Sequence, residues 1–444
     1  MVSTKLYVIL PKNTKLIIYK TKGILIASTK QTEIKKTIAL TIYGCLCGQP
    51  LNTSIEKAIS NNYEKPIDVL LGILALIKEN ELLLTNKSVN DTTAVINKEN
   101  VFYPQGIHVE LTKSCNLKCY YCYKEAIFSK NKQLLETSKL LDILHHLASK
   151  GLKVVELTGG EPLLHPDFLI ILKTCYNLFE KVAILTNGTL IDENFIDNVK
   201  KYKDKLVFSI SLDSYDEIEY EKKSGIIGSF KQATKGIRLL TKEEFFVRAS
   251  MAVDDSNWYH IEKTLLYAKS LGVSSFTYSP IMPSGRADKK RVLWETLPIE
   301  DLVSFEKYII EKYPNFIHTL EGRSIKELQL PGGCGAGSRT FVLNEEGLVR
   351  MCATSENYGL IGDLKTQSID DVFSHPLCKI VSDLILPNKI YCSNCKRLPL
   401  CAGCPLKVLE QIKIIGRDNC YWLKNNTIAQ RWYDMVNVKR NNNL

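Results

Sequence analysis

The segment Ser114-Cys-Asn-Leu-Lys-Cys-Tyr-Tyr-Cys-Tyr123 contains three cysteines, Cys115, Cys119 and Cys122, in the spacing C-x3-C-x2-C. Three thiolates this close together can hold three irons of a [4Fe-4S] cluster and leave the fourth iron without a protein ligand. An iron without a protein ligand can bind and reduce another molecule. The segment therefore predicts a redox-active iron-sulfur site.

Other uses of cysteine fit this segment less well. A zinc site usually combines a C-x2-C pair with a second pair of ligands, but the nearest candidates, His145 and His146, are adjacent residues in an expected helix. Disulfides need an oxidising compartment, and the N-terminal residues Met-Val-Ser-Thr-Lys-Leu-Tyr lack the charged and apolar regions of a secretory signal. The longest evident apolar run, 69–77, is far shorter than a membrane span. We therefore expect reduced cysteines, a cytoplasmic protein and no membrane contact.

Apolar strands and amphipathic helices alternate after the cysteine segment. Strands are expected at 154–157, 182–185, 206–210, 246–253 and 275–282, and helices at 134–147, 166–178 and 230–240. The first three of these strands run into the polar turns Thr158-Gly159-Gly160-Glu161-Pro162, Thr186-Asn187-Gly188 and Ser211-Leu212-Asp213. From about residue 106 to residue 300, this alternation favours a parallel α/β sheet.

The cysteine segment and the turns that follow it resemble the radical S-adenosylmethionine (radical SAM) superfamily. Members reduce SAM on such a cluster and release a 5′-deoxyadenosyl radical, which abstracts a hydrogen from the substrate. The resemblance implies a partial (β/α)6 barrel whose ligands lie at the C-terminal ends of the strands. It also implies that Cys115, Cys119 and Cys122 hold the cluster and that SAM is contacted by Tyr121, Gly159, Gly160, Glu161, Asn187, Ser211, Asp213 and Arg248. In that family the glycines let the backbone approach the ligand closely.

Two further parts of the barrel sequence bear on SAM binding. Relatives usually follow the Ser-Leu-Asp turn with a His and then an Arg that bonds the SAM carboxylate, but Tyr220 and Ser224 stand at those places here. The candidate replacements are Lys222, Lys223 and Arg248. The segment Pro283-Ser284-Gly285-Arg286-Ala287 resembles the family loop near the adenine.

A second cysteine-rich block lies near the C-terminus and resembles the SPASM extension of radical SAM enzymes that modify peptides and proteins. Its seven cysteines are Cys334, Cys352, Cys392, Cys395, Cys401, Cys404 and Cys420. By the family's interleaved pattern, one auxiliary cluster is held by Cys392, Cys395, Cys401 and Cys420, and the other by Cys334, Cys352 and Cys404. The spacing Cys401-x2-Cys404 differs from the common x3, so this partition stays open. The alternative, a zinc ribbon, leaves three of the seven cysteines unexplained.

Three protein ligands on the second auxiliary cluster would leave one iron free, and we expect a substrate cysteine thiolate to bind there. Cys378 is a possible fourth ligand, but the stretch 368–384 is typical of an amphipathic helix that could simply bury it. Cys45, Cys47 and Cys175 lie outside any recognised ligand spacing and are assigned no chemistry.

The N-terminal residues predict a small module of their own. A β-hairpin is expected at 15–19 and 24–28, followed by helices at 32–45, 51–59 and 66–78 and a strand at 82–84. This order resembles the winged-helix elements of peptide maturases, which capture a leader peptide as an added strand on the hairpin edge. Winged helices can instead bind DNA. However, the net charge of +10 is spread along the chain without a dense basic run, so no nucleic acid is expected.

The expected organisation therefore has three folded parts. The predicted fold is α/β, a partial (β/α)6 radical SAM barrel with an N-terminal winged-helix module and a C-terminal Cys-rich SPASM domain. The boundaries are 1–85 for the recognition element, 86–104 for a linker, 105–300 for the barrel, 301–332 for a bridging region, 333–425 for the SPASM domain and 426–444 for a tail. At 444 residues and 45% hydrophobic content, the chain can bury more than one core.

The combined resemblance extends to maturases of ribosomally made peptides, particularly subtilosin-type sactipeptide enzymes, which join a cysteine sulfur to an α-carbon. It implies SAM and three [4Fe-4S] clusters as cofactors, a precursor peptide as substrate, and an electron donor such as flavodoxin or ferredoxin. Alternatives within the enzyme class are a carbon-carbon or carbon-oxygen crosslinking maturase and a peptide epimerase. From a different class, the chain could be an iron-sulfur binding scaffold or a DNA-binding redox sensor. No catalytic acid or base is assigned.

Overall fold

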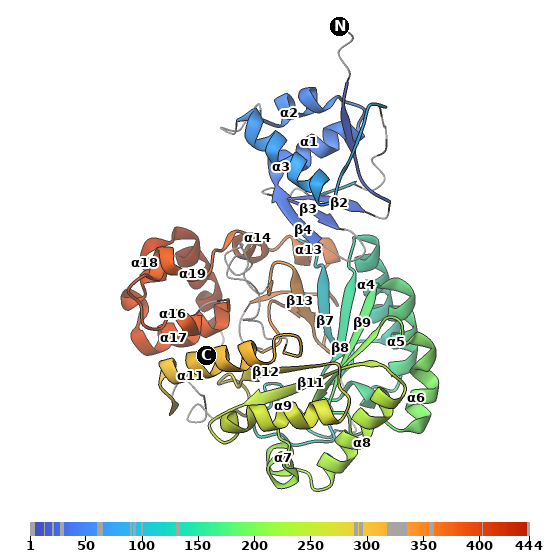
Figure 1. The fold of residues 1–444 in the computed structure, drawn as a ribbon, viewed down its shortest axis with the longest axis vertical. Coiled ribbons are helices and arrows are strands. Elements are labelled where there is room, and N and C mark those ends of the chain that lie inside the picture. Colours follow the sequence, from blue (N-terminus) through green and yellow to red (C-terminus); the bar gives the residue numbers. More distant parts are fainter. Residues whose placement is uncertain are drawn as a thin grey trace. The chain divides into compact units, whose positions relative to one another are not determined.

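The structure is a computed structural model that describes residues 5–12, 14–19, 22–26, 31–59, 65–88, 91, 95–98, 101–129, 134–287, 292, 296–317, 335–354, 359–401 and 403–441. The chain divides into two compact units, Met1–Phe102 and Tyr103–Leu444 (Figure 1). Every helix within the described ranges is too short or too polar to cross a bilayer.

The first unit packs three helices on small β-sheets. A four-stranded sheet has the order β4-β3-β2-β6, and a separate antiparallel pair is formed by β1 and β5. The strands are β1 (Tyr7–Ile9), β2 (Lys15–Tyr19), β3 (Lys22–Ile26), β4 (Gln31–Lys35), β5 (Leu83–Thr85) and β6 (Val95–Lys98), and the helices are α1 (Lys36–Leu46), α2 (Leu51–Ile59) and α3 (Pro66–Lys78). Leu16, Leu25, Ile42 and Ile73 are among the side chains of its buried core.

The predicted hairpin is present, and α2 and α3 have the expected bounds, but two segments differ from expectation. Residues 32–35, expected to begin a helix, lie in β4 and pair with β3. Residues 95–98, expected in a linker, form β6 and pair in parallel with β2. In both segments, pairing with a neighbouring strand overrides the local signal. Among the described strands of this sheet, the edges are therefore β4 and β6, and both strands of the hairpin are internal.

The second unit is built on a nine-stranded sheet of order β12-β11-β10-β9-β8-β7-β13-β14-β15. Its first six strands in sequence are parallel: β7 (Gly106–Glu110), β8 (Val154–Thr158), β9 (Lys181–Thr186), β10 (Leu206–Ser211), β11 (Phe246–Val253) and β12 (Ser275–Pro280). Their order along the sheet follows their order in the chain, as in a partial barrel. The expected strands from 154 onward are all found.

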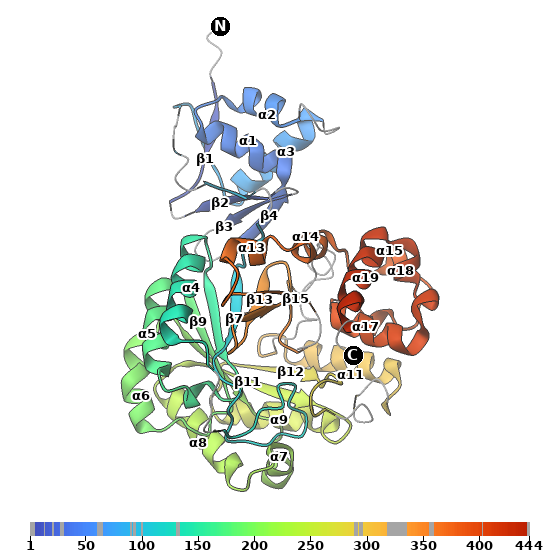
Figure 2. The same cartoon turned by 180° about the vertical axis from the view of Figure 1, so that it is seen from behind.

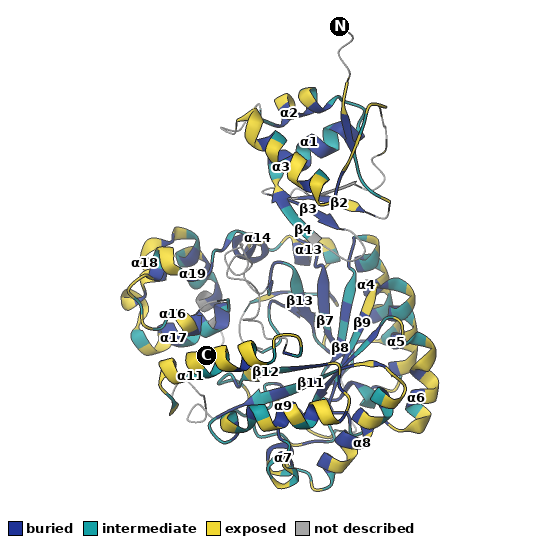
Figure 3. Ribbon diagram, in the orientation of Figure 1, coloured by how far each residue is buried: buried dark blue, intermediate teal, exposed yellow. Residues whose placement is uncertain are grey.

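Helices alternate with these strands and cover the outer face of the sheet (Figure 1, Figure 2). They are α4 (Thr137–Ser149), α5 (Phe168–Leu178), α6 (Glu193–Val199), α7 (Glu217–Ser224), α8 (Ser229–Lys242) and α9 (Ile261–Ser270). The strands between them are largely buried, whereas the helices expose their outer faces (Figure 3). This pattern explains why the strand sequences are apolar and the helices amphipathic.

After the barrel, the chain adds an antiparallel extension to the sheet and a helical region. The strand β13 (Thr340–Leu343) pairs in parallel with β7, and β14 (Leu348–Arg350) and β15 (Leu360–Asp363) follow in antiparallel order. The helices of this region are α11 (Ile299–Lys312), α13 (Ile369–Phe373), α14 (Pro376–Asp383), α15 (Lys389–Cys392), α16 (Leu398–Cys401), α17 (Pro405–Ile415), α18 (Tyr421–Asn425) and α19 (Thr427–Asn441).

The segment expected to be a C-terminal tail instead forms α19. Its Trp432 is buried against Trp422 of α18, with ring centroids 5.7 Å apart. Ala429, Trp432 and Val436 are buried and recur at helical spacing. The apolar face of α19 thus anchors this end of the described chain.

Candidate radical SAM site

The three cysteines of the C-x3-C-x2-C segment lie in the loop that follows β7, at the C-terminal edge of the parallel strands. Burial and the nearby Cys122 and Glu161 raise the pKa of Cys115 to about 11, and burial with Asp213 and the two other thiols raises the pKa of Cys119 further. The cysteines that the structure describes are all free thiols. Neighbouring thiols disfavour one another's ionisation, but they become thiolates when bound iron neutralises their charge. The three cysteines therefore fit three irons of one cluster.

The Gly159-Gly160 turn packs against the start of the cysteine loop. The amide of Gly160 donates to the carbonyl of Thr112 at 2.6 Å, and the amide of Glu161 donates to that of Ser114 at 2.9 Å. A Cβ atom on Gly160 would clash with the Ser114 carbonyl, lying 2.7 Å from its carbon. The structure shows that these glycines also allow close approach of the backbone that leads into Cys115.

Glu161 is fully buried and holds two strand ends together. Its Oε1 accepts from the Thr186 hydroxyl at 2.7 Å and from the Leu163 amide at 3.1 Å, and its Oε2 accepts from the Asn187 amide at 2.9 Å. Burial raises its pKa from 4.5 to about 7 although these bonds favour the charged form. Glu161 thus positions Asn187, whose Nδ2 donates to Asn116 at 2.9 Å and lies 3.9 Å from the sulfur of Cys115.

A second group of site residues surrounds Asp213. The Tyr121 hydroxyl donates to Asp213 Oδ2, and the amide of Ala252 donates to Oδ1 at 2.7 Å. Burial raises the pKa of Asp213, and the nearby charge of Lys223 partly offsets that effect. Tyr121 and Asp213 are therefore brought together beside the cysteine loop, joined by a bond that the sequence did not suggest.

The structure separates the three candidate replacements for the missing arginine. Lys223 is buried, 3.2 Å from Asp254, and donates to the Tyr120 hydroxyl at 2.9 Å. Lys222 is exposed. Arg248 lies within β11 and donates to the Ser209 hydroxyl at 3.2 Å, away from the strand end. Of the three, Lys223 lies closest to the Tyr121–Asp213 pair, because its ammonium is 5.5 Å from the Tyr121 ring centroid. Ser211 is the last residue of β10, as expected.

The loop that resembles the family's adenine loop is hydrogen-bonded to the cysteine loop. The Arg286 amide donates to the carbonyl of Cys122, and its guanidinium donates to the carbonyls of Cys119 and Ala126, at 2.9–3.0 Å. Gly285 has a positive φ of 59°, and its Cβ position overlaps the Cys122 carbonyl. Sequence reasoning missed this role of Arg286 because its partners are backbone carbonyls, which carry no sequence signal.

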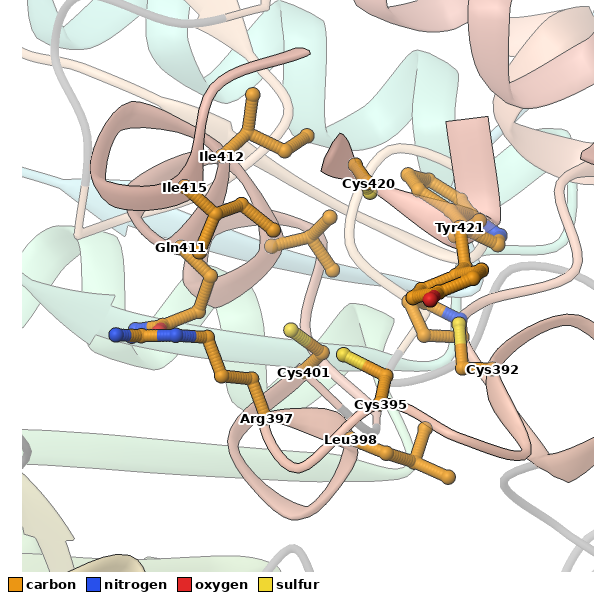
Figure 4. A pocket seen from close by; sticks show the side chains of 13 residues that line it. Cys392, Cys395, Arg397, Leu398, Cys401, Gln411, Ile412, Ile415, Cys420 and Tyr421 are labelled. Atoms are coloured by element: carbon orange, nitrogen blue, oxygen red, sulfur yellow. The ribbon is translucent and has the colours of Figure 1, made fainter. Parts of the chain in front are cut away.

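The C-terminal cysteines fall into two groups. Four of them line one pocket, in which apolar side chains and the polar residues Arg397 and Gln411 complete the wall (Figure 4). These cysteines are Cys392, Cys395, Cys401 and Cys420. Burial and the neighbouring thiols Cys395 and Cys420 raise the pKa of Cys392 to about 11. Within the described residues, no three His, Cys, Asp or Glu side chains converge on one point as single-ion ligands, so these thiols surround the pocket rather than meet in it.

The remaining cysteines of this block lie elsewhere. The thiol of Cys404 is close enough to Cys352 to raise its pKa, after the larger effect of burial. Cys334 lies outside the described residues. Cys378 is buried in α14, where burial raises its pKa to about 12, and no other cysteine contributes to that shift. Cys404 is thus near Cys352, and neither is among the residues that line the four-cysteine pocket.

Comparison with known proteins relates the chain to radical SAM enzymes. Residues 109–278 match the model of the Radical SAM superfamily. The antilisterial bacteriocin subtilosin biosynthesis protein AlbA of Bacillus subtilis is 29% identical over 368 residues, covering 81% of this chain and 80% of that protein. The AdoMet-dependent heme synthase of Methanosarcina barkeri is 30% identical over 186 residues, covering 42% of this chain and 53% of that protein.

A solved structure extends the fold match to most of the chain. The crystal structure of Streptococcus suis SuiB bound to precursor peptide SuiA superposes with a TM-score of 0.62 at 17% identity, covering 95% of this chain and all of that one (100%). This likeness confirms the predicted radical SAM α/β fold with a mostly parallel sheet. Residues 109–278 are a radical SAM domain, and the chain that contains it is an enzyme.

Proposed function

We propose that this enzyme modifies a ribosomally made precursor peptide by joining a cysteine sulfur to an α-carbon as a thioether. The observation that carries the proposal is the arrangement of the C-terminal cysteines, in which four line one pocket and Cys404 is near enough to Cys352 to raise its pKa. The similarity to the subtilosin biosynthesis protein supports it, because that similarity extends well beyond the radical SAM domain.

In this proposal, Cys115, Cys119 and Cys122 hold the SAM-binding [4Fe-4S] cluster, which when bound supplies the reducing power for hydrogen abstraction. Gly159, Gly160 and Arg286 fix the loop that carries these cysteines. SAM is oriented by Tyr121, Gly159, Gly160, Glu161, Asn187, Ser211, Asp213 and Arg248 as the family resemblance implies, with Lys223 as the cation nearest to Tyr121 and Asp213. An electron donor such as flavodoxin or ferredoxin reduces the enzyme.

The four-cysteine pocket suits an auxiliary cluster. Gln411 is buried, and its Oε1 accepts from the Arg397 guanidinium, which can only donate. The Nε2 atom of Gln411 is consequently the donor end, and it has no hydrogen-bond partner among the residues that the structure describes. A buried N–H group beside four thiols is matched by the acceptor sulfur atoms of a bound cluster. The second auxiliary cluster would be held by Cys334, Cys352 and Cys404, leaving an iron for the substrate thiolate, and an auxiliary cluster would accept the electron released when the sulfur–carbon bond forms.

The N-terminal unit offers two features for a leader peptide. In the described sheet, β4 is an edge strand to which an extended peptide can add. Helix α3 exposes Ile67, Leu71 and Leu74, each about half accessible to solvent, along one face. We propose that the leader binds at this unit through main-chain bonds and apolar side chains.

The test is a reaction with the peptide encoded beside the gene for this enzyme. Anaerobically reconstituted protein is supplied with SAM, dithionite and a cysteine-containing peptide, and the products are analysed by mass spectrometry. The proposal predicts the loss of two hydrogens and a peptide cysteine that no longer reacts with alkylating agents. Cys352→Ala should abolish the crosslink while SAM is still cleaved, and Cys378→Ala is the matched control that should retain it.

Other outcomes would point to other chemistry. Loss of two hydrogens with a cysteine that still alkylates would favour a carbon-carbon or carbon-oxygen crosslink. An unchanged mass with incorporation of solvent deuterium at an α-carbon would favour epimerisation. SAM cleavage with no change in any peptide would contradict the proposal.

A further inference from the structure

Four charged side chains form a buried cluster between the cysteine loop after β7 and the β13–β14 hairpin. They are Glu110, Lys124, Glu345 and Arg350, and at most 6% of any of these side chains is exposed. The ammonium of Lys124 lies 2.8 Å from both Glu110 and Glu345. The guanidinium of Arg350 donates to both carboxylate oxygens of Glu110, at 2.6 and 2.7 Å. The cluster thus contains two positive and two negative charges, and all four are shielded from water.

Each basic member of this cluster adjoins a different cysteine. Lys124 follows Cys122 by two residues, and the intervening Tyr123 donates its hydroxyl to Glu110 at 3.0 Å. Arg350 precedes Cys352 by two residues, and its Nε donates to the Cys352 carbonyl at 3.1 Å. Glu110, at the end of β7, is therefore the shared partner of the Cys122 loop and the Cys352 loop.

Stability alone does not account for this cluster. Removing charges from water costs so much that apolar residues of similar size often serve a fold equally well. A buried ion network does impose one geometry, because each group must keep its partners or leave a charge unpaired. Strands β7 and β13 already lie side by side (Figure 1), so strand pairing alone would join the two segments without ion pairs.

We propose that Glu110 is a positioning residue that holds the Cys122 loop and the Cys352 loop in one fixed relation, so that a change at either loop is felt at the other. The inference deepens the proposed function, because it rests on the assignment of these cysteines as cluster ligands. Arg350 touches none of the three cysteines that hold the SAM-binding cluster, yet its loss should loosen their loop through Glu110.

The test is hydrogen-deuterium exchange of the full chain without clusters, read in peptides that cover 115–129 and 352–354. Arg350→Gln should speed exchange of both segments by about tenfold or more, since it leaves a buried carboxylate partly unpaired. Glu345→Gln should speed exchange of 115–129 more than that of 352–354, because Arg350 keeps its contacts with Glu110. Lys153→Gln is the matched control. Its ion pair with Glu180 (2.9 Å) lies just before β8 and β9, at the N-terminal ends of the parallel strands, whereas the cysteine loop lies at their C-terminal ends. The substitution should therefore change the exchange of neither segment.

A folded Arg350→Gln variant whose 115–129 segment exchanges at the wild-type rate would overturn the proposal. If that variant does not fold, Arg350→Lys replaces it, because lysine keeps the charge but cannot reach both Glu110 and the Cys352 carbonyl. In reconstituted protein, Arg350→Gln should also alter the change in the EPR spectrum that SAM induces. If wild-type protein shows no SAM-dependent spectrum at all, the ligand assignment fails, and the exchange experiment still decides whether the two loops are coupled.

Discussion

Glu161 gives the sharpest prediction on pH dependence. Burial raises its pKa from 4.5 to about 7. As pH rises from 4.5 to 7, the unfolded chain loses this proton while the folded chain retains it, so the free energy of unfolding falls. Well above pH 7 the full penalty applies, about 3.5 kcal/mol at about 1.4 kcal/mol per pKa unit. Glu161→Gln cannot ionise and removes this dependence.

The assay is urea unfolding of wild type and Glu161→Gln at pH 5 and pH 8, followed by tryptophan fluorescence. All four tryptophans (258, 294, 422 and 432) belong to the unit Tyr103–Leu444, so the signal reports on the unit that contains Glu161. Glutamine also loses hydrogen bonds that Glu161 accepts. This loss changes the variant's free energy of unfolding by the same amount at both pH values, so it cancels when the two pH values are compared. Relative to wild type, the variant should gain about 2.5 kcal/mol between pH 5 and pH 8, because part of the penalty is already present at pH 5. A gain near zero would refute the claim that Glu161 is held as a buried acid.

Three further substitutions test other parts of the structure. Gly160→Ala should displace Ser114 and lower the amount of iron bound by the adjoining cysteine loop. Gly228→Ala is the control, because Gly228 has a positive φ and nothing lies within 4 Å of its Cβ position. It should cost about 1–2 kcal/mol of backbone strain and leave the iron content unchanged. Lys223→Met should lower the free energy of unfolding of the second unit by about 3–5 kcal/mol, measured with urea, because it leaves Asp254 buried without its cation. The control Lys222→Met changes an exposed neighbouring residue and should alter the free energy of unfolding by no more than about 0.5 kcal/mol. Trp432→Ala should lower the free energy of unfolding by about 3–5 kcal/mol, because it opens a cavity beside Trp422. Trp432→Phe should cost clearly less, because it keeps a ring and removes a buried N–H that has no partner within the described part of the chain. Equal losses in the two variants would contradict this packing.

The barrel was predictable because its signals are local. The apolar stretches at 154–157, 182–185 and 206–210 are bounded by polar turns, and each becomes a strand whose end carries a site residue. The residues 32–35 and 95–98 were not assigned to strands, since their pairing with β3 and β2 depends on segments distant in sequence. Burial of the Ala429, Trp432 and Val436 face likewise required the rest of the C-terminal region.

The site was predictable where chemistry requires a particular residue type at a particular spacing. The C-x3-C-x2-C segment and the Gly-Gly-Glu turn are examples. The roles of the supporting residues were not, because their partners are backbone atoms or distant charges. Arg286 bonds the carbonyls of Cys119 and Ala126, and Glu110 meets Arg350, which lies 240 positions further along the chain. Such contacts arise only when the sheet brings the two segments together.

The most direct test of the account is an iron and sulfide count on reconstituted wild-type protein and on the triple variant Cys115→Ala/Cys119→Ala/Cys122→Ala, together with an assay for 5′-deoxyadenosine. The account predicts about twelve irons in wild type and about eight in the variant, with SAM cleavage only in wild type. About four irons or fewer in wild type, zinc in the C-terminal block, or SAM cleavage that survives in the variant would contradict it.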